Sequence, residues 1–145
     1  MEFLFTPDQE AWLNDLEKTR AKQGNFQLRG PSGWCCLGRA CKLAGITPRK
    51  VGVNEDTGLY TLINKGDENA FLFDECRIRL PISVVDKLHL RGDMGLIKGA
   101  NNYPELGGHT TLADLNDWHG WTFKQIARWI RKNPTAVFTR GLEED

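Results

Sequence analysis

The stretch from Gly33 to Gly45, which reads GWCCLGRACKLAG, constrains the fold of this 145-residue chain more than any other feature. It follows a turn signal at Pro31-Ser32 and holds three of the four cysteines. Small and apolar residues recur at helical spacing in two neighbouring stripes, Cys36, Ala40 and Leu43 and then Leu37, Cys41 and Ala44. Gly45 suits the left-handed conformation that ends a helix. The pattern predicts a short, buried helix that other elements approach closely.

Cys35 and Cys36 begin this helix, which leaves two interpretations open. Unpaired N–H groups and the helix dipole favour a thiolate or a bound anion at a helix N-terminus. Free cysteines are also often inert and buried. Without an export signal the cysteines are expected to be reduced. Cys76 and the three histidines lack the spacing of a zinc site, so we expect no metal and no cofactor.

Composition limits the classes of protein that the chain can represent. Hydrophobic residues make up 40% and charged residues 26%, and the formal net charge is zero, so we expect no nucleic-acid partner. No apolar run is long enough to cross a bilayer, and we expect a cytoplasmic location in a host cell. The length fits one domain over residues 1–140, followed by an acidic, disordered tail over residues 141–145.

Capping signals and helical periodicity place the helices. Thr6 with Gln9, and Thr122 with Gln125, form capping boxes. The expected helices run from Thr6 to about Lys22, lie between Gly33 and Gly45, open at Leu80-Pro81, follow Thr110 or Thr111, and run from Thr122 to Asn133. Residues 92–108 are rich in glycine and are expected to form an irregular loop.

Between Arg49 and Ile78 the period changes from helical to two. Three β-prone runs at Val51-Gly52-Val53, 59–63 and 70–73 are separated by turn-rich segments. A further short strand is expected at 25–29. We therefore predict an α+β domain, in which a three-stranded antiparallel meander carries about four helices on one side.

Several short motifs follow one another along the chain in the same order as in a known group of proteins, which the chain therefore resembles. They are Gln23-Gly24, Leu28-Arg29, Cys35-Cys36-Leu37-Gly38 with Cys41, Leu80-Pro81, Leu112, Leu115-Asn116-Asp117, Gly120, Thr122-Phe123 and Ile126-Ala127. The chain is similar to a group of small uncharacterised proteins found mainly in bacteriophages and prophages. The resemblance covers both ends of the chain well and the middle poorly. It implies a phage setting but no reaction, because the group's activity is not established.

Two departures from that pattern point to a site of this chain's own. Arg39 stands where an apolar residue is expected, and aromatic Trp118, His119 and Trp121 enlarge the link after Asp117. Guanidinium groups hold phosphate in a bidentate fork, and an exposed indole stacks on a planar ligand. The ligand-binding residues that we expect are Arg29, Trp34, Cys35, Arg39, Asn116, Asp117, Trp118 and Trp121. The alternative is that these arginines form only a solvated face.

A cysteine hydrolase is the second hypothesis. Cys35 would be the nucleophile, His109 or His119 the base, and Asn116 or Asp117 the group that orients the base. The two Asx residues also fit a helix-to-helix corner, where such side chains bond the neighbouring backbone.

The function that we expect is non-catalytic. The chain would be a phage accessory protein that binds a small phosphorylated or nucleotide-like ligand. Sequestration of a host immune signal is one role that such binding would serve. The alternatives are the cysteine hydrolase and an inhibitor that binds a host protein. The sequence leaves homo-oligomerisation open.

Overall fold

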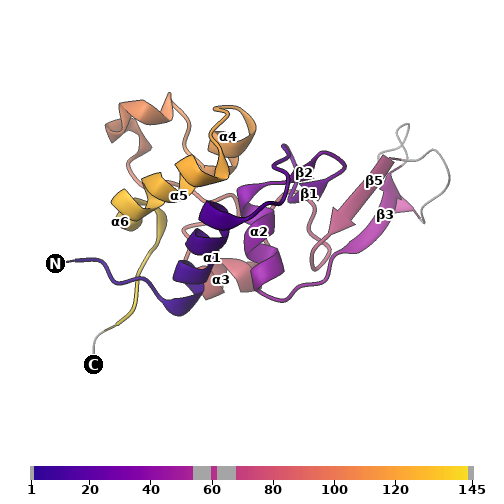
Figure 1. Cartoon of the computed structure of the whole chain (residues 1–145), viewed down its shortest axis with the longest axis horizontal. Helices are drawn as coiled ribbons and strands as arrows, with labels where there is room; N and C mark the ends of the chain where they lie inside the picture. Colours follow the sequence, from indigo (N-terminus) through magenta and orange to yellow (C-terminus); the bar gives the residue numbers. More distant parts are fainter. Residues whose placement is uncertain (1, 54–59, 62–67, 144–145) are drawn as a thin grey trace.

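The chain folds into an α+β structure, seen in a computed structural model that describes residues 2–53, 60–61 and 68–143 (Figure 1). Its α-helices are α1 (Pro7–Lys18), α2 (Cys36–Leu43), α3 (Ile82–Leu88), α4 (Leu112–Asp117), α5 (Phe123–Lys132) and α6 (Pro134–Val137). The 3-10 helices are η1 (Ala100–Asn102) and η2 (Pro104–Leu106). The strands are β1 (Arg29–Gly30), β2 (Gly33–Trp34), β3 (Arg49–Val53), β4 (Tyr60–Thr61) and β5 (Glu68–Leu72).

The strands form two antiparallel sheets. β1 pairs with β2 in a short hairpin, and β4, β3 and β5 form a three-stranded sheet in that order. The predicted meander is wrong, because a meander would place β4 in the centre, whereas β3 occupies it. β3 pairs with β5 along its whole length, from Arg49 opposite Leu72 to Val53 opposite Glu68. β4 pairs with only the last two residues of β3. The turn segments between these strands lie outside the described residues.

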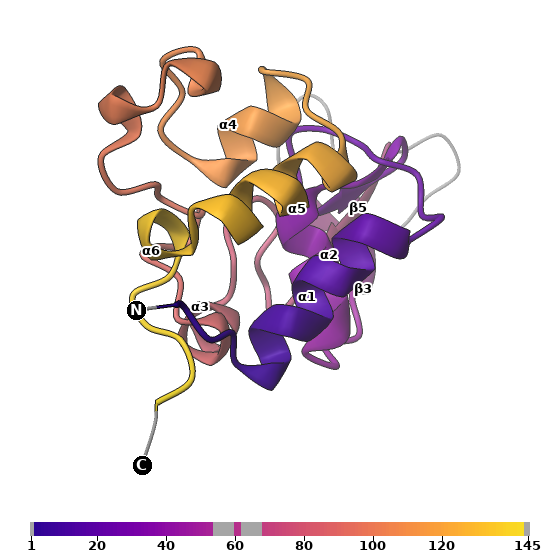
Figure 2. The same ribbon diagram turned by 60° about the vertical axis from the view of Figure 1, so that its left-hand side comes forward.

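The helices pack on one another rather than on one side of the sheet. α1 lies against α2, α3 and α5, and the sheet of β3, β4 and β5 projects from this helical body beside β1 (Figures 1 and 2). Among the side chains that the structure describes, those of the core come mainly from the helices and the loops between them. The helices therefore satisfy their apolar faces among themselves, which is why the expected layer of helices on the sheet is absent from the described fold.

Both predicted capping boxes are present. The Thr6 hydroxyl accepts from the Gln9 N–H at 3.1 Å, and the Thr6 N–H donates to the Gln9 side chain at 2.9 Å. The corresponding distances for Thr122 and Gln125 are 3.2 and 2.8 Å. α1 ends at Lys18, earlier than expected. α6 was not predicted. The sequence predicts Asn133-Pro134 only as the end of α5, but Pro134 is also the first residue of a new short helix, a position that suits proline.

The cysteine-rich helix α2 is as buried as its sequence predicts. Cys36 and Cys41 are fully buried, and Gly45 has a φ of +81° just beyond the helix end. Leu43 was expected inside but is 44% exposed, and it lines a surface pocket together with residues of α1 and α3. The expected strand at 25–29 is also wrong: Phe26 has a φ of +70° and is half exposed, and only Arg29 enters a strand.

The described ends of the chain lie beside each other. The Leu142 N–H donates to the Leu4 carbonyl at 2.6 Å, and Phe3 stacks on Phe138. Residues 144–145 lie outside the described residues, so the disordered tail over 141–145 stays a prediction. No helix within the described ranges combines the length and the apolar character needed to span a membrane.

The backbone of Leu28 packs directly against Gly38 of α2, and this contact generates a stability prediction. A Cβ added at Gly38 would overlap the carbonyl oxygen of Leu28, which is backbone and accepts a bond from the Cys35 N–H at 3.0 Å. Gly38→Ala is expected to lower the free energy of unfolding by about 1–3 kcal/mol, because α2 must move away from β1. Urea denaturation followed by circular dichroism measures this. Gly92→Ala is the control, since its nearest neighbour is the Leu96 Cβ at 3.9 Å. Equal midpoints for both variants would contradict the packing.

Candidate functional site

Three cationic side chains surround the indole ring of Trp34. The guanidinium carbons of Arg29 and Arg39 lie 4.7 and 5.1 Å from the ring centroid, and the Lys42 ammonium lies 6.0 Å from it. Such contacts are attractive because the negative face of an aromatic ring draws a cation. The structure thus brings together Arg29, Trp34 and Arg39, three of the residues expected to bind a ligand, and adds Lys42.

These residues line an open pocket of about 450 Å³, which we call the Trp34 pocket. Its remaining lining residues are Ala21, Gly45, Ile46, Thr47 and Pro48. The volume lies within the range of small-molecule sites, roughly 300–1,000 Å³. The pocket runs along the side and C-terminal end of α2, because β1, β2 and the segment after α2 form its walls.

The cations of the Trp34 pocket differ in their partners. Arg39 is 4% exposed and forms a bidentate ion pair with Asp15 of α1, at 2.8 and 2.7 Å. Arg29 and Lys42 have no carboxylate partner among the described residues, and Arg29 also lies over the Phe71 ring at 4.2 Å. Asp15 therefore neutralises one charge, and the two remaining charges make the pocket positive.

The N-terminal end of α2 is not available to an anion in the way the sequence suggested. The Cys36 N–H donates to the Asn116 side chain at 3.2 Å. The Gly38 N–H donates to the Cys35 sulfur at 3.3 Å. Both amides therefore have partners within the chain. The cations beside Trp34 lie along the side and C-terminal end of α2 instead, away from the predicted anion site.

The Asn116 side chain joins three segments at the centre of the molecule. Its Oδ1 accepts from the Gln23 side chain at 2.8 Å as well as from the Cys36 N–H. Its Nδ2 donates to the Gly24 carbonyl at 2.8 Å and to the Asp117 carboxylate at 2.9 Å. Asn116 is 2% exposed, and all four hydrogen-bonding positions of its amide are used. As a structural residue, Asn116 was expected only to bond the neighbouring backbone at a corner between helices. Its bonds to Gln23, Gly24 and Cys36 give it a structural role over a much longer range.

Gln23 extends the same network to the start of α5. Its Nε2 also donates to the Trp121 carbonyl at 2.8 Å, and its Oε1 accepts from the Phe123 N–H at 3.1 Å. Asp117 accepts from the Phe26 N–H at 2.9 Å, which holds Phe26 in its left-handed conformation. The motif residues at 23–24, 35–38, 116–117 and 121–123 thus meet in one hydrogen-bond network.

The surroundings of Cys35 oppose a nucleophilic role. Its side chain is 4% exposed, and burial raises the pKa of the Cys35 thiol to about 12. A catalytic thiolate needs a pKa shifted the other way, toward neutrality. Within the described residues, the Cys35 sulfur accepts a hydrogen bond from the Gly38 N–H and none from a histidine.

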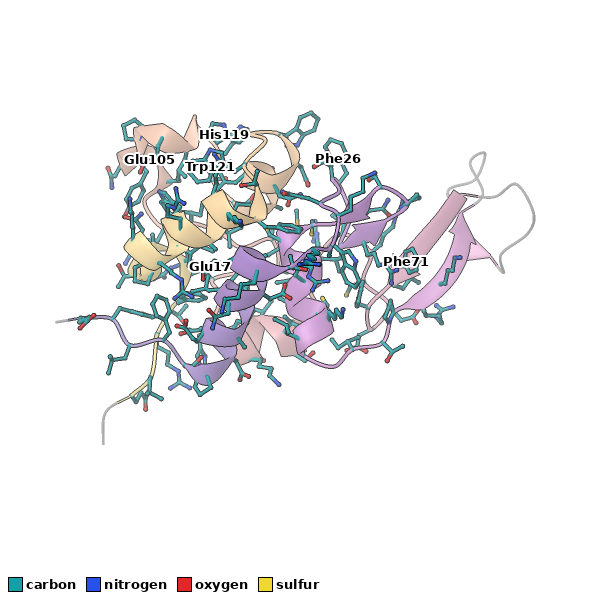
Figure 3. The ribbon with its side chains drawn as sticks, viewed as in Figure 1. Glu17, Phe26, Phe71, Glu105, His119 and Trp121 are labelled. Carbon is teal, nitrogen blue, oxygen red and sulfur yellow. The ribbon has the colours of Figure 1, made fainter. Side chains whose placement is uncertain are left out.

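The two candidate histidines lie together, with Trp121 and Glu105. The ring centroids of His109 and His119 are 5.2 Å apart, and His119 lies 5.3 Å from Trp121. The His119 Nε2 is 2.9 Å from the Glu105 carbonyl oxygen. Figure 3 shows Glu105, His119 and Trp121 gathered beside α4 and α5, away from Phe71 and the sheet.

The predicted binding residues therefore fall in different places. Trp118 is 69% exposed and meets the edge of Phe26 at a centroid distance of 5.0 Å. Trp121 lines a second pocket, together with Glu105, Gln125, Arg128, Trp129, Lys132 and Asn133. None of the other residues of this pocket was expected at a site from the sequence. The spacing of Arg128 and Lys132 on the polar side of the predicted helix was the signal that could have found them.

Within the described ranges, no group of three or more His, Cys, Asp or Glu side chains is arranged to hold a metal ion. A family model described as "Domain of unknown function (DUF8296)" matches residues 8–134. The chain belongs to this family of uncharacterised proteins, and the match includes both the network around Asn116 and the Trp34 pocket. No curated protein and no solved structure matches the chain.

The network around Asn116 yields a prediction that depends on pH. Asn116→Asp replaces a donor by a buried carboxyl oxygen facing the Gly24 carbonyl, and is expected to cost at least about 2 kcal/mol of stability. Burial beside Asp117 raises the folded-state pKa of the introduced carboxyl above its unfolded value of about 3.9. The loss is therefore expected to grow as pH rises above about 4.

Thermal unfolding at several pH values, compared with the parent, measures this loss. Asn101→Asp is the control, because Asn101 is exposed. A loss that is equally large at acidic and neutral pH would contradict the assigned hydrogen bonds.

The raised pKa of Cys35 predicts low thiol reactivity. In the folded protein near neutral pH, iodoacetamide is expected to alkylate the half-buried Cys76 first and Cys35 only after unfolding. Peptide mass spectrometry of samples labelled with and without denaturant reads out each site. Fast labelling of native Cys35 would instead favour the nucleophile hypothesis.

Proposed function

We propose that the chain binds a small phosphorylated ligand in the Trp34 pocket without converting it. The observation that carries this proposal is the placement of Arg29 and Lys42 at one pocket, with no carboxylate partner among the described residues. Phosphate oxygens would supply the anionic partner that these two cations lack. Hydrogen bonds between charged groups are also stronger than those between neutral groups.

The phosphate group is the part of the ligand that this pocket recognises. Trp34 is in contact with the guanidinium groups of Arg29 and Arg39, and its ring also lies 5.7 Å from that of Phe73. The indole therefore orients the cations rather than offering a free face to a nucleobase. The ion pair with Asp15 holds the Arg39 guanidinium in place beside Trp34, since the Arg39 and Asp15 side chains are both largely buried.

Binding without turnover is the form of the proposal that the surroundings of Cys35 support. A thiol with a pKa of about 12 stays protonated at neutral pH, and a protonated thiol is a poor nucleophile. The cysteine hydrolase is therefore less well supported than binding.

A bacteriophage setting is part of the same proposal. Its support is the resemblance of the motif residues to small phage and prophage proteins. In that setting, binding of a phosphorylated signal would lower its free concentration in the host cell. Stoichiometric loss of the free ligand, without new products, is the behaviour expected of such a protein.

Charge reversal at the rim of the pocket tests the proposal. Lys42→Glu is expected to weaken binding of phosphorylated compounds by about tenfold or more, because an attraction becomes a repulsion. Lys42 is exposed, so the fold should be unaffected. The measurement is calorimetry with pyrophosphate, ribose 5-phosphate, cyclic nucleotides and ADP-ribose at low and high salt. Lys98→Glu is the control, since Lys98 is exposed and lies outside the pocket.

Equal affinities for both variants would overturn the assignment of the pocket. If no phosphorylated compound binds the parent, a protein partner becomes the better hypothesis. The exposed pair of Phe26 and Trp118 is the observation that favours that second candidate. Retention of a host protein that is lost with Trp118→Ala would then support it.

A further inference from the structure

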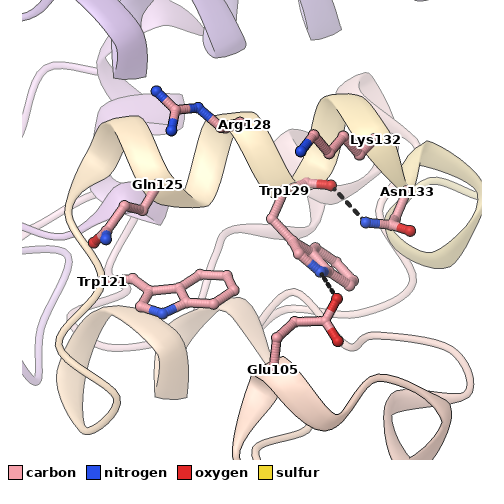
Figure 4. A pocket seen from close by; sticks show the side chains of 7 residues that line it. All are labelled: Glu105, Trp121, Gln125, Arg128, Trp129, Lys132 and Asn133. Atoms are coloured by element: carbon pink, nitrogen blue, oxygen red, sulfur yellow. Dashed lines mark hydrogen bonds between the residues drawn. The ribbon is translucent and has the colours of Figure 1, made fainter.

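A second pocket, of about 310 Å³, lies between η2 and α5 (Figure 4). We call it the Trp121 pocket, and it is lined by Glu105, Trp121, Gln125, Arg128, Trp129, Lys132 and Asn133. Figure 4 shows Arg128 and Lys132 on the α5 side, with Glu105 across from them and the two indoles between. The pocket therefore combines flat apolar surface, cations and a carboxylate.

The two tryptophans of this pocket are placed differently. Trp129 is 6% exposed, and its indole N–H donates to the Glu105 carboxylate at 3.1 Å. Its ring also meets the edge of Tyr103 at a centroid distance of 5.2 Å. Trp121 is half buried, packs on His119, and has no hydrogen-bond partner for its indole N–H among the described residues. Trp129 thus forms the floor, while Trp121 retains surface and a donor for a ligand.

The cations of α5 also divide by partner. Arg131 is bound by Glu10 and Glu17 of α1, at 2.8 and 2.6 Å. Arg128 and Lys132 have no carboxylate partner among the described residues, and both are exposed. They lie four residues apart on one face of α5, so their side chains are neighbours. They form a positive edge beside the two indoles.

We infer that the Trp121 pocket binds a nucleotide through its aromatic base and its phosphate together. The base stacks on Trp121, where π-stacking on a partly exposed ring is favourable for any base. The phosphate lies at Arg128 and Lys132, whose donors match its oxygens. Glu105, Gln125 and Asn133 also line the pocket, and each keeps one polar group without a partner among the described residues, namely Glu105 Oε1, Gln125 Nε2 and Asn133 Oδ1, for the base edge or the ribose hydroxyls.

This inference does not depend on the proposed function of the Trp34 pocket. Trp34 is surrounded by cations, whereas Trp121 has none within the contacts that the structure describes. The two pockets share no lining residue. A ligand that needs a base and a phosphate is therefore expected at Trp121, and one recognised by its phosphate alone at Trp34.

The test is calorimetric titration of the parent protein with AMP, adenosine and ribose 5-phosphate. AMP is expected to bind most tightly, because adenosine lacks the phosphate and ribose 5-phosphate lacks the base. Trp121→Ala and Arg128→Ala are each expected to weaken AMP binding by about tenfold. Lys124→Ala is the matched control, since Lys124 is exposed and lies outside the Trp121 pocket. Circular dichroism checks that each variant folds.

Three results would overturn the inference. The first is the absence of AMP binding to the parent. The second is adenosine binding as tightly as AMP, or ribose 5-phosphate binding as tightly as AMP to the Lys42→Glu variant, in which the Trp34 pocket is disabled. The third is AMP affinity that falls with Lys42→Glu but not with Trp121→Ala or Arg128→Ala, which would place AMP in the Trp34 pocket. Loss of AMP binding in both pocket variants, with pyrophosphate binding at the Trp34 pocket unchanged, would support two separate sites.

Discussion

The side-chain amide of Asn116 is the interaction on which the centre of the structure depends. It is buried, and its two acceptor and two donor positions are all engaged by groups from the Gln23 loop, the start of α2 and Asp117. A buried amide is stabilising only if its partners are all in place, because each unpaired group would carry a desolvation cost. The positions of the Gln23 loop, α2 and α4 are therefore specified together.

Acidic residues on α1 decide which cations are free to meet a ligand. Asp15 pairs with Arg39, and Glu10 with Glu17 holds Arg131. Arg39 therefore joins α2 to α1, and Arg131 joins α5 to α1, although each arginine also lines a pocket together with other cations. The acids of α1 thus separate structural arginines from the cations available for binding, which no count of charges along the chain would reveal.

Local signals in the sequence predicted the helices well and the long-range arrangement poorly. Thr6, Thr122 and Gly45 mark element ends through contacts with residues a few positions away, so a pattern reveals them. The order of the strands depends on pairing across turns, which sequence periodicity does not encode. The same division holds for the site. Arg29 and Trp34 were both expected at the site, but the hairpin that pairs them was not predicted, and neither was the ion pair between Arg39 and Asp15 of a separate helix.

The network around Asn116 also has a consequence for the order in which the chain can fold. The Cys36 N–H and the Gln23 side chain find their partner 80 and 93 residues later in the sequence. A nascent chain that has emerged only as far as β5 lacks that partner, so the start of α2 is left without it until Asn116 has been synthesised. Contacts of such large sequence separation slow folding, because loop closure must come before they form. We therefore expect the helical body to assemble late and cooperatively, once α4 is available to pair with the Gln23 loop and α2.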